Sequence, residues 1–151
     1  MAPVALRTLW LVGYSLWCGG FVFYSGVVLT VLREHIPDHP PGAVTRDVTL
    51  WLNAAGLATL FVWWHEWRQC PPRPRLGLAL MWSATILQTG LILLHWPLGQ
   101  LYDSGDRRFG PWHQVYLWGA TALFGVQIIL LPLTIVRWRA ADRATSPAPP
   151  V

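Results

Sequence analysis

The sequence predicts an all-α integral membrane protein: an antiparallel four-helix bundle with both termini in the cytoplasm. Three observations support this class. Only 12% of the 151 residues are charged, which is roughly half the share in an ordinary soluble domain. These charges are confined to short segments, and the long stretches between the segments contain none. All eleven basic residues are arginines, and they are distributed unevenly between the two sets of connecting segments.

Four uncharged stretches predict the helices. A helix needs about 20 mainly apolar residues to cross a bilayer core of about 30 Å. The stretches are, in chain order, Thr8 to Leu32, Val48 to His65, Leu76 to Tyr102 and Phe109 to Val136. The first, third and fourth exceed this length, and the second is at the short end of the range. We therefore expect one transmembrane domain, residues 1–139, with helices over about residues 5–33, 46–68, 75–97 and 111–138.

The segments between these helices contain residues that end helices. The first connection, His35 to Gly42, has three prolines and a glycine, and the second, Gln69 to Pro74, is a short basic turn. The third, Pro97 to Pro111, is the longest and most polar. After the fourth helix, residues 140–151 are rich in Ala, Ser, Thr and Pro, which predicts a disordered C-terminal tail.

The arginines predict the orientation. With the N-terminus inside, the inner segments hold seven arginines: Arg7, Arg68, Arg73, Arg75, Arg137, Arg139 and Arg143. The outer connections hold four, which are Arg33, Arg46, Arg107 and Arg108. Because cytoplasmic segments carry the excess of basic residues, this distribution favours cytoplasmic termini. The net charge of +4 reflects these flanking arginines and does not indicate a nucleic-acid partner.

Polar residues at helical spacing predict which faces point into the bundle. Gln88 and His95 align on the third helix, and His113, Tyr116 and Gln127 align on the fourth. Polar side chains in membrane helices are expected to bond across helix interfaces rather than face lipid. Eight of the eleven tryptophans are interpreted differently, as anchors at the two membrane surfaces. Those near the inner surface are Trp10, Trp63, Trp64, Trp67 and Trp138, and those near the outer one are Trp51, Trp96 and Trp112.

Two histidines are the candidate site. His95 ends the third helix and His113 begins the fourth, so both should lie at the outer mouth of the bundle. We expect them to line one outward-facing pocket with Tyr116 on its wall, Gln88 and Gln127 in the same interior, and Asp103 as the carboxylate partner. Three explanations for the two histidines stay open. They pack the mouth of the bundle as hydrogen-bonded polar side chains, they bind a metal or haem, or they line a polar pocket for a substrate, ion or proton.

Signatures of soluble enzymes are absent: there is no Gly-rich phosphate loop, Cys-x-x-Cys or His-Glu-x-x-His. None of the four uncharged stretches contains an acid, which disfavours a transporter driven by a carboxylate inside the membrane. The sequence favours a non-enzymatic membrane protein, although enzymatic activity stays open. It would handle a small solute or metal, or serve as an accessory subunit of a larger membrane complex, and no resident cofactor is expected. The alternative is a redox subunit that binds haem or copper through His95 and His113. Expected partners are the lipid bilayer and either other membrane proteins or further copies of the chain.

Several short blocks carry a resemblance to a known family. They are Leu16 to Tyr24 (LWCGGFVFY), Val31 to His35 (VLREH), Gly42 to Asn53, His95 to Leu98 (HWPL) with Asp103, and Trp112 to Trp118 (WHQVYLW). Together they resemble small four-helix bacterial membrane proteins of unknown function that are related to eukaryotic transmembrane protein 205. The resemblance covers most of residues 8–138, and the family's histidine near the start of the last helix matches His113.

This resemblance implies a multi-pass protein of the bacterial cytoplasmic (inner) membrane. One position departs from the family pattern, because Thr30 or a neighbour stands where the family usually has a proline near the end of the first helix. The family has no settled activity that could be transferred to this chain.

Overall fold

The described part of the chain is almost entirely helical. The computed structural model describes residues 2–35, 41–69 and 74–145. Its elements are α1 (Ala2–Phe23), the π-helical segment η1 (Tyr24–Val28), α2 (Leu29–His35), α3 (Pro41–Gln69), α4 (Arg75–Asp103) and α5 (Phe109–Thr145). Because α1, η1 and α2 follow one another without a break, they form one long helical rod. The all-α class expected from the sequence is confirmed.

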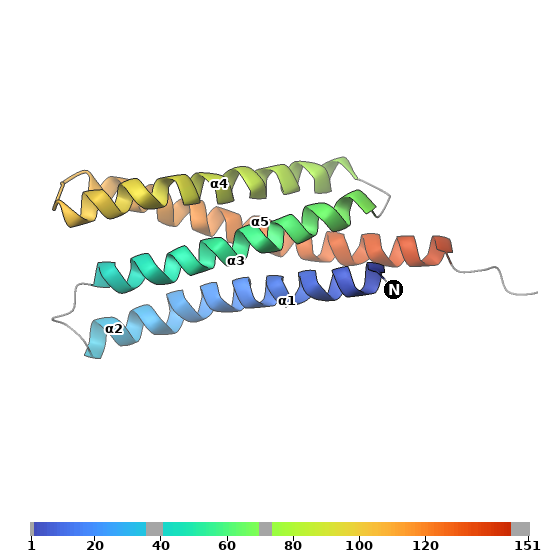
Figure 1. Cartoon of the computed structure of the whole chain (residues 1–151), viewed down its shortest axis with the longest axis horizontal. Coiled ribbons are helices and arrows are strands. Elements are labelled where there is room, and N and C mark those ends of the chain that lie inside the picture. The colour runs from blue at the N-terminus through green and yellow to red at the C-terminus, as the bar shows by residue number, and fades with distance from the viewer. Residues whose placement is uncertain (1, 36–40, 70–73, 146–151) are drawn as a thin grey trace, which may run out of the picture.

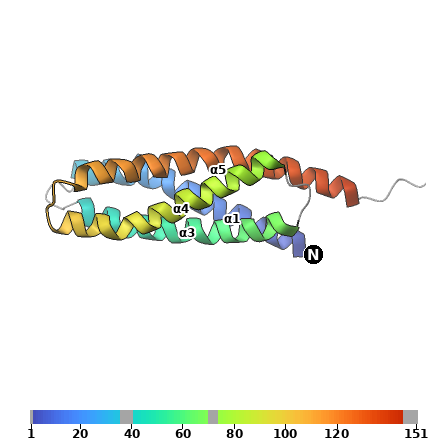
Figure 2. The ribbon, with the colours of Figure 1, turned by 90° about the horizontal axis from the view of Figure 1, so that it is seen from above.

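The four rods lie side by side and alternate in direction (Figures 1 and 2). The start of α1, the end of α3, the start of α4 and the end of α5 lie at one end, which we call the proximal end (Figure 1). The end of α2, the start of α3 and the α4–α5 connection lie at the opposite, distal end. In chain order, α1 packs against α3, α3 against α4, and α4 against α5.

The contact between α1 and α5 differs from the other three. These two helices meet through large aromatic side chains rather than through close backbone packing. At the proximal end the rings of Trp10 and Trp138 are 5.4 Å apart, and nearer the distal end Phe21 stacks on Phe124 at 5.1 Å. An ion pair of 2.9 Å between Arg7 and Asp142 adds a second proximal link. The first and last helices are therefore joined most firmly at the proximal end.

Three helical rods are long and apolar enough to cross a membrane: Val4–Leu32, Arg75–Asp103 and Phe109–Ala144. The remaining rod, α3, is as long as α4 but is not among them. Its polar residues Asn53, Thr59 and Glu66 are all buried against the other helices.

The surface is more apolar than that of a soluble protein. Phe61, Leu93 and Trp118 are among many large apolar side chains on it, while the mainly apolar interior also holds the completely buried Gln88, Gln127 and Thr134. Charged and amide side chains are rarely buried in soluble proteins, and large contiguous apolar surfaces mark sites that contact a membrane or another protein. The apolar surface and the buried polar groups therefore agree with the three apolar helices.

Several helix ends differ from the sequence-based expectation. α4 continues through Pro97 to Asp103, and α3 begins at Pro41, where the first turn of a helix tolerates proline. α5 continues to Thr145, because Ala140, Ala141 and Arg143 favour helix and Asp142 pairs with Arg7. The disordered tail predicted from residue 140 is thus wrong for 140–145, and residues 146–151 lie outside the described part.

The π-helical turn was not predicted. In η1 the backbone N–H of Leu29 donates to the carbonyl of Tyr24, five residues back. Such single turns insert into α-helices without an obvious sequence signal and are frequent at functional sites. Here the wide turn leaves Tyr24 buried in the interior, while Ser25 and Gly26 beside it stay exposed.

Gly56 provides a test of the close approach between helices. A Cβ at this buried position would lie 2.5 Å from Gln88 Oε1 and 2.6 Å from Trp17 Nε1. We expect Gly56→Ala to lower the free energy of unfolding by about 1–3 kcal/mol, because neither buried neighbour can move freely. SDS-induced unfolding in mixed micelles would measure the change.

Gly90→Ala is the matched control. This glycine is on an exposed part of α4, and a Cβ there would meet no atom within 4 Å. The substitution should be neutral or stabilise the helix by up to about 1 kcal/mol. Equal effects of the two substitutions would contradict the packing of α3 against α1 and α4.

Candidate functional site

A cavity of about 540 Å³ lies in the distal half of the molecule. All four rods contribute to its wall, which includes Trp17 of α1, Tyr24 of η1, Asn53 of α3, Leu91 of α4 and Ala120 of α5. Most of the lining is apolar or aromatic, with a few polar groups. Cavities of about 300–1,000 Å³ with this kind of lining typically hold small ligands.

Both predicted histidines line the cavity. His95 of α4 and His113 of α5 both line it, and so does Tyr116. The ring of His95 lies 6.5 Å from that of Tyr116, and His113 stacks on Phe109 at 5.1 Å with an interplanar angle of 21°. Among the described residues, neither imidazole has a hydrogen-bond or ion-pair partner. Both rings can therefore donate to or accept from a ligand in the cavity.

A chain of hydrogen bonds leads from the cavity wall into the interior. Asn53 Nδ2 donates to the hydroxyl of Tyr116 at 2.8 Å, and Gln88 Nε2 donates to Asn53 Oδ1 at 3.1 Å. All three residues are buried. Gln88 thus contacts the cavity through Asn53 rather than lining it. In a low-dielectric interior these bonds fix the orientation of each side chain, because breaking one would leave a buried polar atom unpaired.

Gln127 is not part of the cavity wall. It is completely buried on α5, toward the proximal end, and its backbone carbonyl accepts a 3.5 Å hydrogen bond from the hydroxyl of Tyr14. Its side-chain amide has no partner among the described residues. The sequence therefore placed Gln127 correctly in the interior, but the structure separates it from the histidines.

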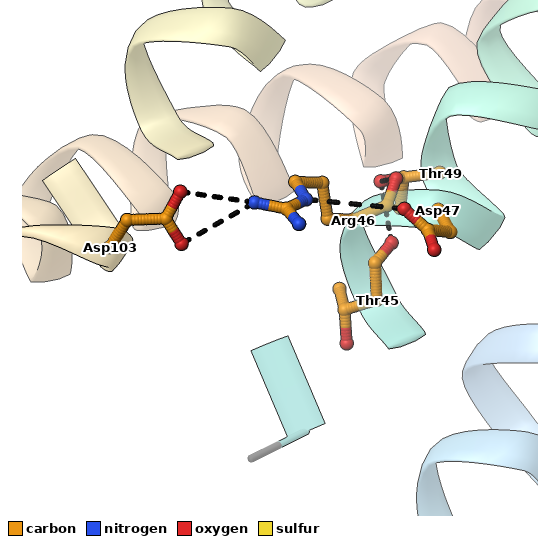
Figure 3. Close-up of polar contacts among 5 residues, drawn as sticks. All are labelled: Thr45, Arg46, Asp47, Thr49 and Asp103. Carbon is orange, nitrogen blue, oxygen red and sulfur yellow. Dashed lines mark hydrogen bonds and ion pairs between the residues drawn. The ribbon is translucent and has the colours of Figure 1, made fainter. Parts of the chain in front are cut away.

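The expected pairing of Asp103 with the histidines is wrong. Asp103 is exposed at the end of α4, where both carboxylate oxygens accept hydrogen bonds from Arg46 Nη1 at 3.2 and 3.4 Å. Figure 3 shows the Arg46 side chain between Asp103 and Asp47, whose Oδ1 lies 3.9 Å from Arg46 Nε. A guanidinium is always charged and binds carboxylates with several donors, so it takes the carboxylate in preference to a neutral imidazole.

Arg46 lies at the distal mouth of the cavity. It lines the cavity wall, and its side chain passes over Gly99, where a Cβ would lie 3.5 Å from Arg46 Cδ. The two carboxylates beside it offset its positive charge. Sequence reasoning counted Arg46 only as a flanking charge and missed this position.

A buried ion pair at the proximal end was also missed. The side chains of Glu66 and Arg137 are each 2% exposed, and Arg137 Nη2 pairs with Glu66 Oε2. Trp138 Nε1 donates to Glu66 Oε1 at 2.6 Å, and the Arg137 guanidinium lies 4.0 Å from the centre of the Trp67 ring. Both charged residues were expected at the membrane boundary. The signal that could have found Glu66 is its spacing of three from Trp63 and seven from Thr59, which puts all three on one face of α3.

The tryptophans fall into two groups. Four that were expected as surface anchors are buried and pack around this ion pair: Trp10, Trp63, Trp67 and Trp138. The anchor interpretation is therefore wrong for these four. Trp51, Trp96 and Trp112, expected near the outer surface, are exposed in the distal half.

Comparisons with protein-family models, curated proteins and solved structures find no match for the chain. The resemblance to relatives of transmembrane protein 205 therefore stays a prediction. Among the described residues, no three His, Cys, Asp or Glu side chains gather into a group that could hold a metal ion. The chemistry of the site has to be argued from the cavity itself.

The buried ion pair can be tested by removing one or both charges. Glu66→Leu should lower the free energy of unfolding by about 3–5 kcal/mol, because Arg137 would stay buried without its counter-charge. Combining it with Arg137→Met should recover most of that loss, since no buried charge remains. SDS-induced unfolding of the single and double variants measures the coupling.

Asp103→Asn serves as the control, because it removes an exposed ion pair at the other end. It should cost about 0–1 kcal/mol. If Glu66→Leu also cost no more than this, or if the double variant were less stable than either single variant, the buried pair would not hold the proximal end as described.

Proposed function

We propose that the chain is a non-enzymatic, multi-pass protein of the bacterial cytoplasmic membrane that binds a small solute in its distal cavity. One observation carries the proposal: a cavity of about 540 Å³ lies between four helices whose outer surfaces are apolar. A cavity of this size accommodates a small organic molecule. The polar groups that line the cavity, above all His95 and His113, would orient it.

In this proposal all four rods cross the membrane as an antiparallel bundle. Three are apolar enough by composition, and α3 crosses with them because its polar residues face the interior. Backbone groups inside a helix are bonded within it, so α3 needs only an apolar outer surface. Leu50, Leu57 and Phe61 provide such a surface, since all three are exposed.

The charges support cytoplasmic termini. At the distal end, Arg46 pairs with Asp103, and Arg108 pairs with Asp106 at 2.7 Å. Side-chain and backbone hydrogen bonds from Arg108 hold the pKa of Asp106 below its usual range, so this pair is ionised and carries no net charge at neutral pH. The exposed proximal arginines 68, 75, 139 and 143 have fewer acids near them in the sequence. The proximal end therefore fits the cytoplasmic side.

Cysteine labelling would test this orientation. In a variant with Cys18 and Cys70 replaced by serine, Ser104→Cys should react with a membrane-impermeant maleimide added to spheroplasts. Ser104 is preferable to Gly105, whose φ of 65° disfavours other residues. The matched variant Ala144→Cys should react only after permeabilisation. The reverse pattern would place both termini outside.

Binding to the cavity can be measured with naphthalene as a probe. Equilibrium dialysis against protein in lipid nanodiscs, with empty nanodiscs as the blank, should show saturable binding at about one site per chain. Ala120→Trp should abolish it, because Ala120 lines the cavity and an indole would fill part of it. Ala122→Trp is the control, since Ala122 is exposed on the other side of α5. Equal binding to both variants would contradict a solute site in the cavity.

The alternative of a haem- or copper-binding redox subunit is favoured by one observation, namely that His95 and His113 both line the cavity. Imidazole is a ligand for both groups. An absorption spectrum of the purified protein with a haem Soret band would replace the solute proposal by this one. Stoichiometric co-purification of other membrane proteins would instead favour the accessory-subunit interpretation.

A further inference from the structure

We propose that the cavity takes a quinone: a neutral, flat ring with carbonyl oxygens that reaches it from within the bilayer. This inference rests on the proposed function and names the class of solute. Three features of the cavity lead to it, namely its opening, the planes of its rings and the charge of its polar groups.

Besides the distal mouth at Arg46, the cavity reaches the surface sideways, between η1 and α5. Ser25 of η1 and Leu117 and Thr121 of α5 line the cavity and are also exposed at the molecular surface. The two hydroxyls at this side opening donate to carbonyls of their own helices, Ser25 to Phe21 at 2.7 Å and Thr121 to Leu117 at 2.9 Å. The side opening therefore presents a mainly apolar edge. In the proposed membrane setting it faces lipid, so a ligand that enters through it has to be soluble in the bilayer.

The rings in the walls favour a flat ligand. On the α1 side, Trp17 and Phe21 stack at an interplanar angle of 19°. On the α5 side, Phe109 and His113 stack at 21°. Near-parallel rings present flat faces, and aromatic rings prefer offset-stacked or edge-to-face partners. A planar ring that enters the cavity can stack on a ring of its lining, which a branched aliphatic molecule cannot do.

The polar groups favour a neutral ligand that carries hydrogen-bond acceptors. No aspartate or glutamate lines the described cavity, so a cationic ligand would have no counter-charge there. Its one charged lining residue, Arg46, is already paired with Asp103. Burying a charge without a partner is costly, which excludes a strongly ionic ligand. His95 and His113 have no hydrogen-bond partner in the described structure, and each neutral imidazole carries one N–H that can donate to a carbonyl oxygen.

A lipid-soluble ring with carbonyl oxygens satisfies all three conditions, and quinones are the class of small molecule that combines them. The proposal concerns binding alone. No electron transfer is assigned to the protein, because binding through two hydrogen bonds and stacking requires none.

A matched pair of ligands tests the carbonyl requirement. Duroquinone is a tetramethylated benzoquinone, and durene is the same tetramethylated ring without the two oxygens. Equilibrium dialysis against wild-type protein in nanodiscs, corrected with empty nanodiscs, should show at least tenfold tighter binding of duroquinone, since each hydrogen bond in the cavity contributes to affinity. Duroquinone has no free ring position, so it cannot add to a cysteine thiol through one.

Histidine variants then locate the donors. His95→Phe and His113→Phe should each weaken duroquinone binding about five- to tenfold and leave durene binding unchanged. His95→Gln retains an N–H donor and should keep most of the affinity. His65→Phe is the control, because His65 is exposed at the proximal end and bonds to Gln69.

The possible outcomes separate the two proposals. If duroquinone binds wild-type protein no better than durene does, or if both histidine-to-phenylalanine variants bind it normally, the quinone inference is overturned while a solute site stands. If Ala120→Trp leaves the binding of both ligands unchanged, the cavity is not the site and both proposals fail. The wild-type comparison of the two ligands decides the inference even if a histidine variant does not fold.

Discussion

The burial of polar side chains between apolar helices is the constraint on which the rest of this structure depends. A rod whose outer surface is apolar has to place its amides, hydroxyls and charges toward the other rods. Once there, a polar group that finds a partner is favoured, because an unpaired polar group in a low-dielectric interior is costly. The hydrogen bonds from Gln88 to Asn53 and from Asn53 to Tyr116 satisfy this requirement across three helices. They also determine which faces of α3, α4 and α5 meet.

The same constraint acts most strongly on Glu66 and Arg137. A buried ion pair is weak support for stability by itself, since removing two charges from water offsets much of their attraction. The pair nevertheless favours one arrangement of the two helices, because any other arrangement of α3 and α5 would leave both charges unpaired. The hydrogen bond from Trp138 and the ring of Trp67 complete the surroundings of the pair. We infer that this cluster sets the register of α5 against α3.

The two halves of the molecule therefore differ in how their interiors are filled. In the proximal half, tryptophan rings occupy the space between α1, α3 and α5, with Trp10 touching both Trp63 and Trp138. In the distal half, the π-helical turn and the looser contact between α1 and α5 leave a cavity instead. The proximal end is firmly packed and holds the helices together, and the distal end is open and can admit a ligand. This is a simple arrangement for a binding protein within a membrane.

The sequence by itself determined the all-helical class, the approximate position of each helix and the placement of His95 and His113 at one end. These properties follow from local pattern: the length of uncharged stretches and the spacing of polar residues along a helix. Only the tertiary structure decided that Asp103 pairs with Arg46, that Glu66 and Arg137 are internal, and that four tryptophans fill the core. Such pairings depend on the rotation of each helix about its axis and on its depth relative to its neighbours. A single sequence does not define these quantities, because they arise from contacts between residues such as Glu66 and Arg137 that are 71 positions apart.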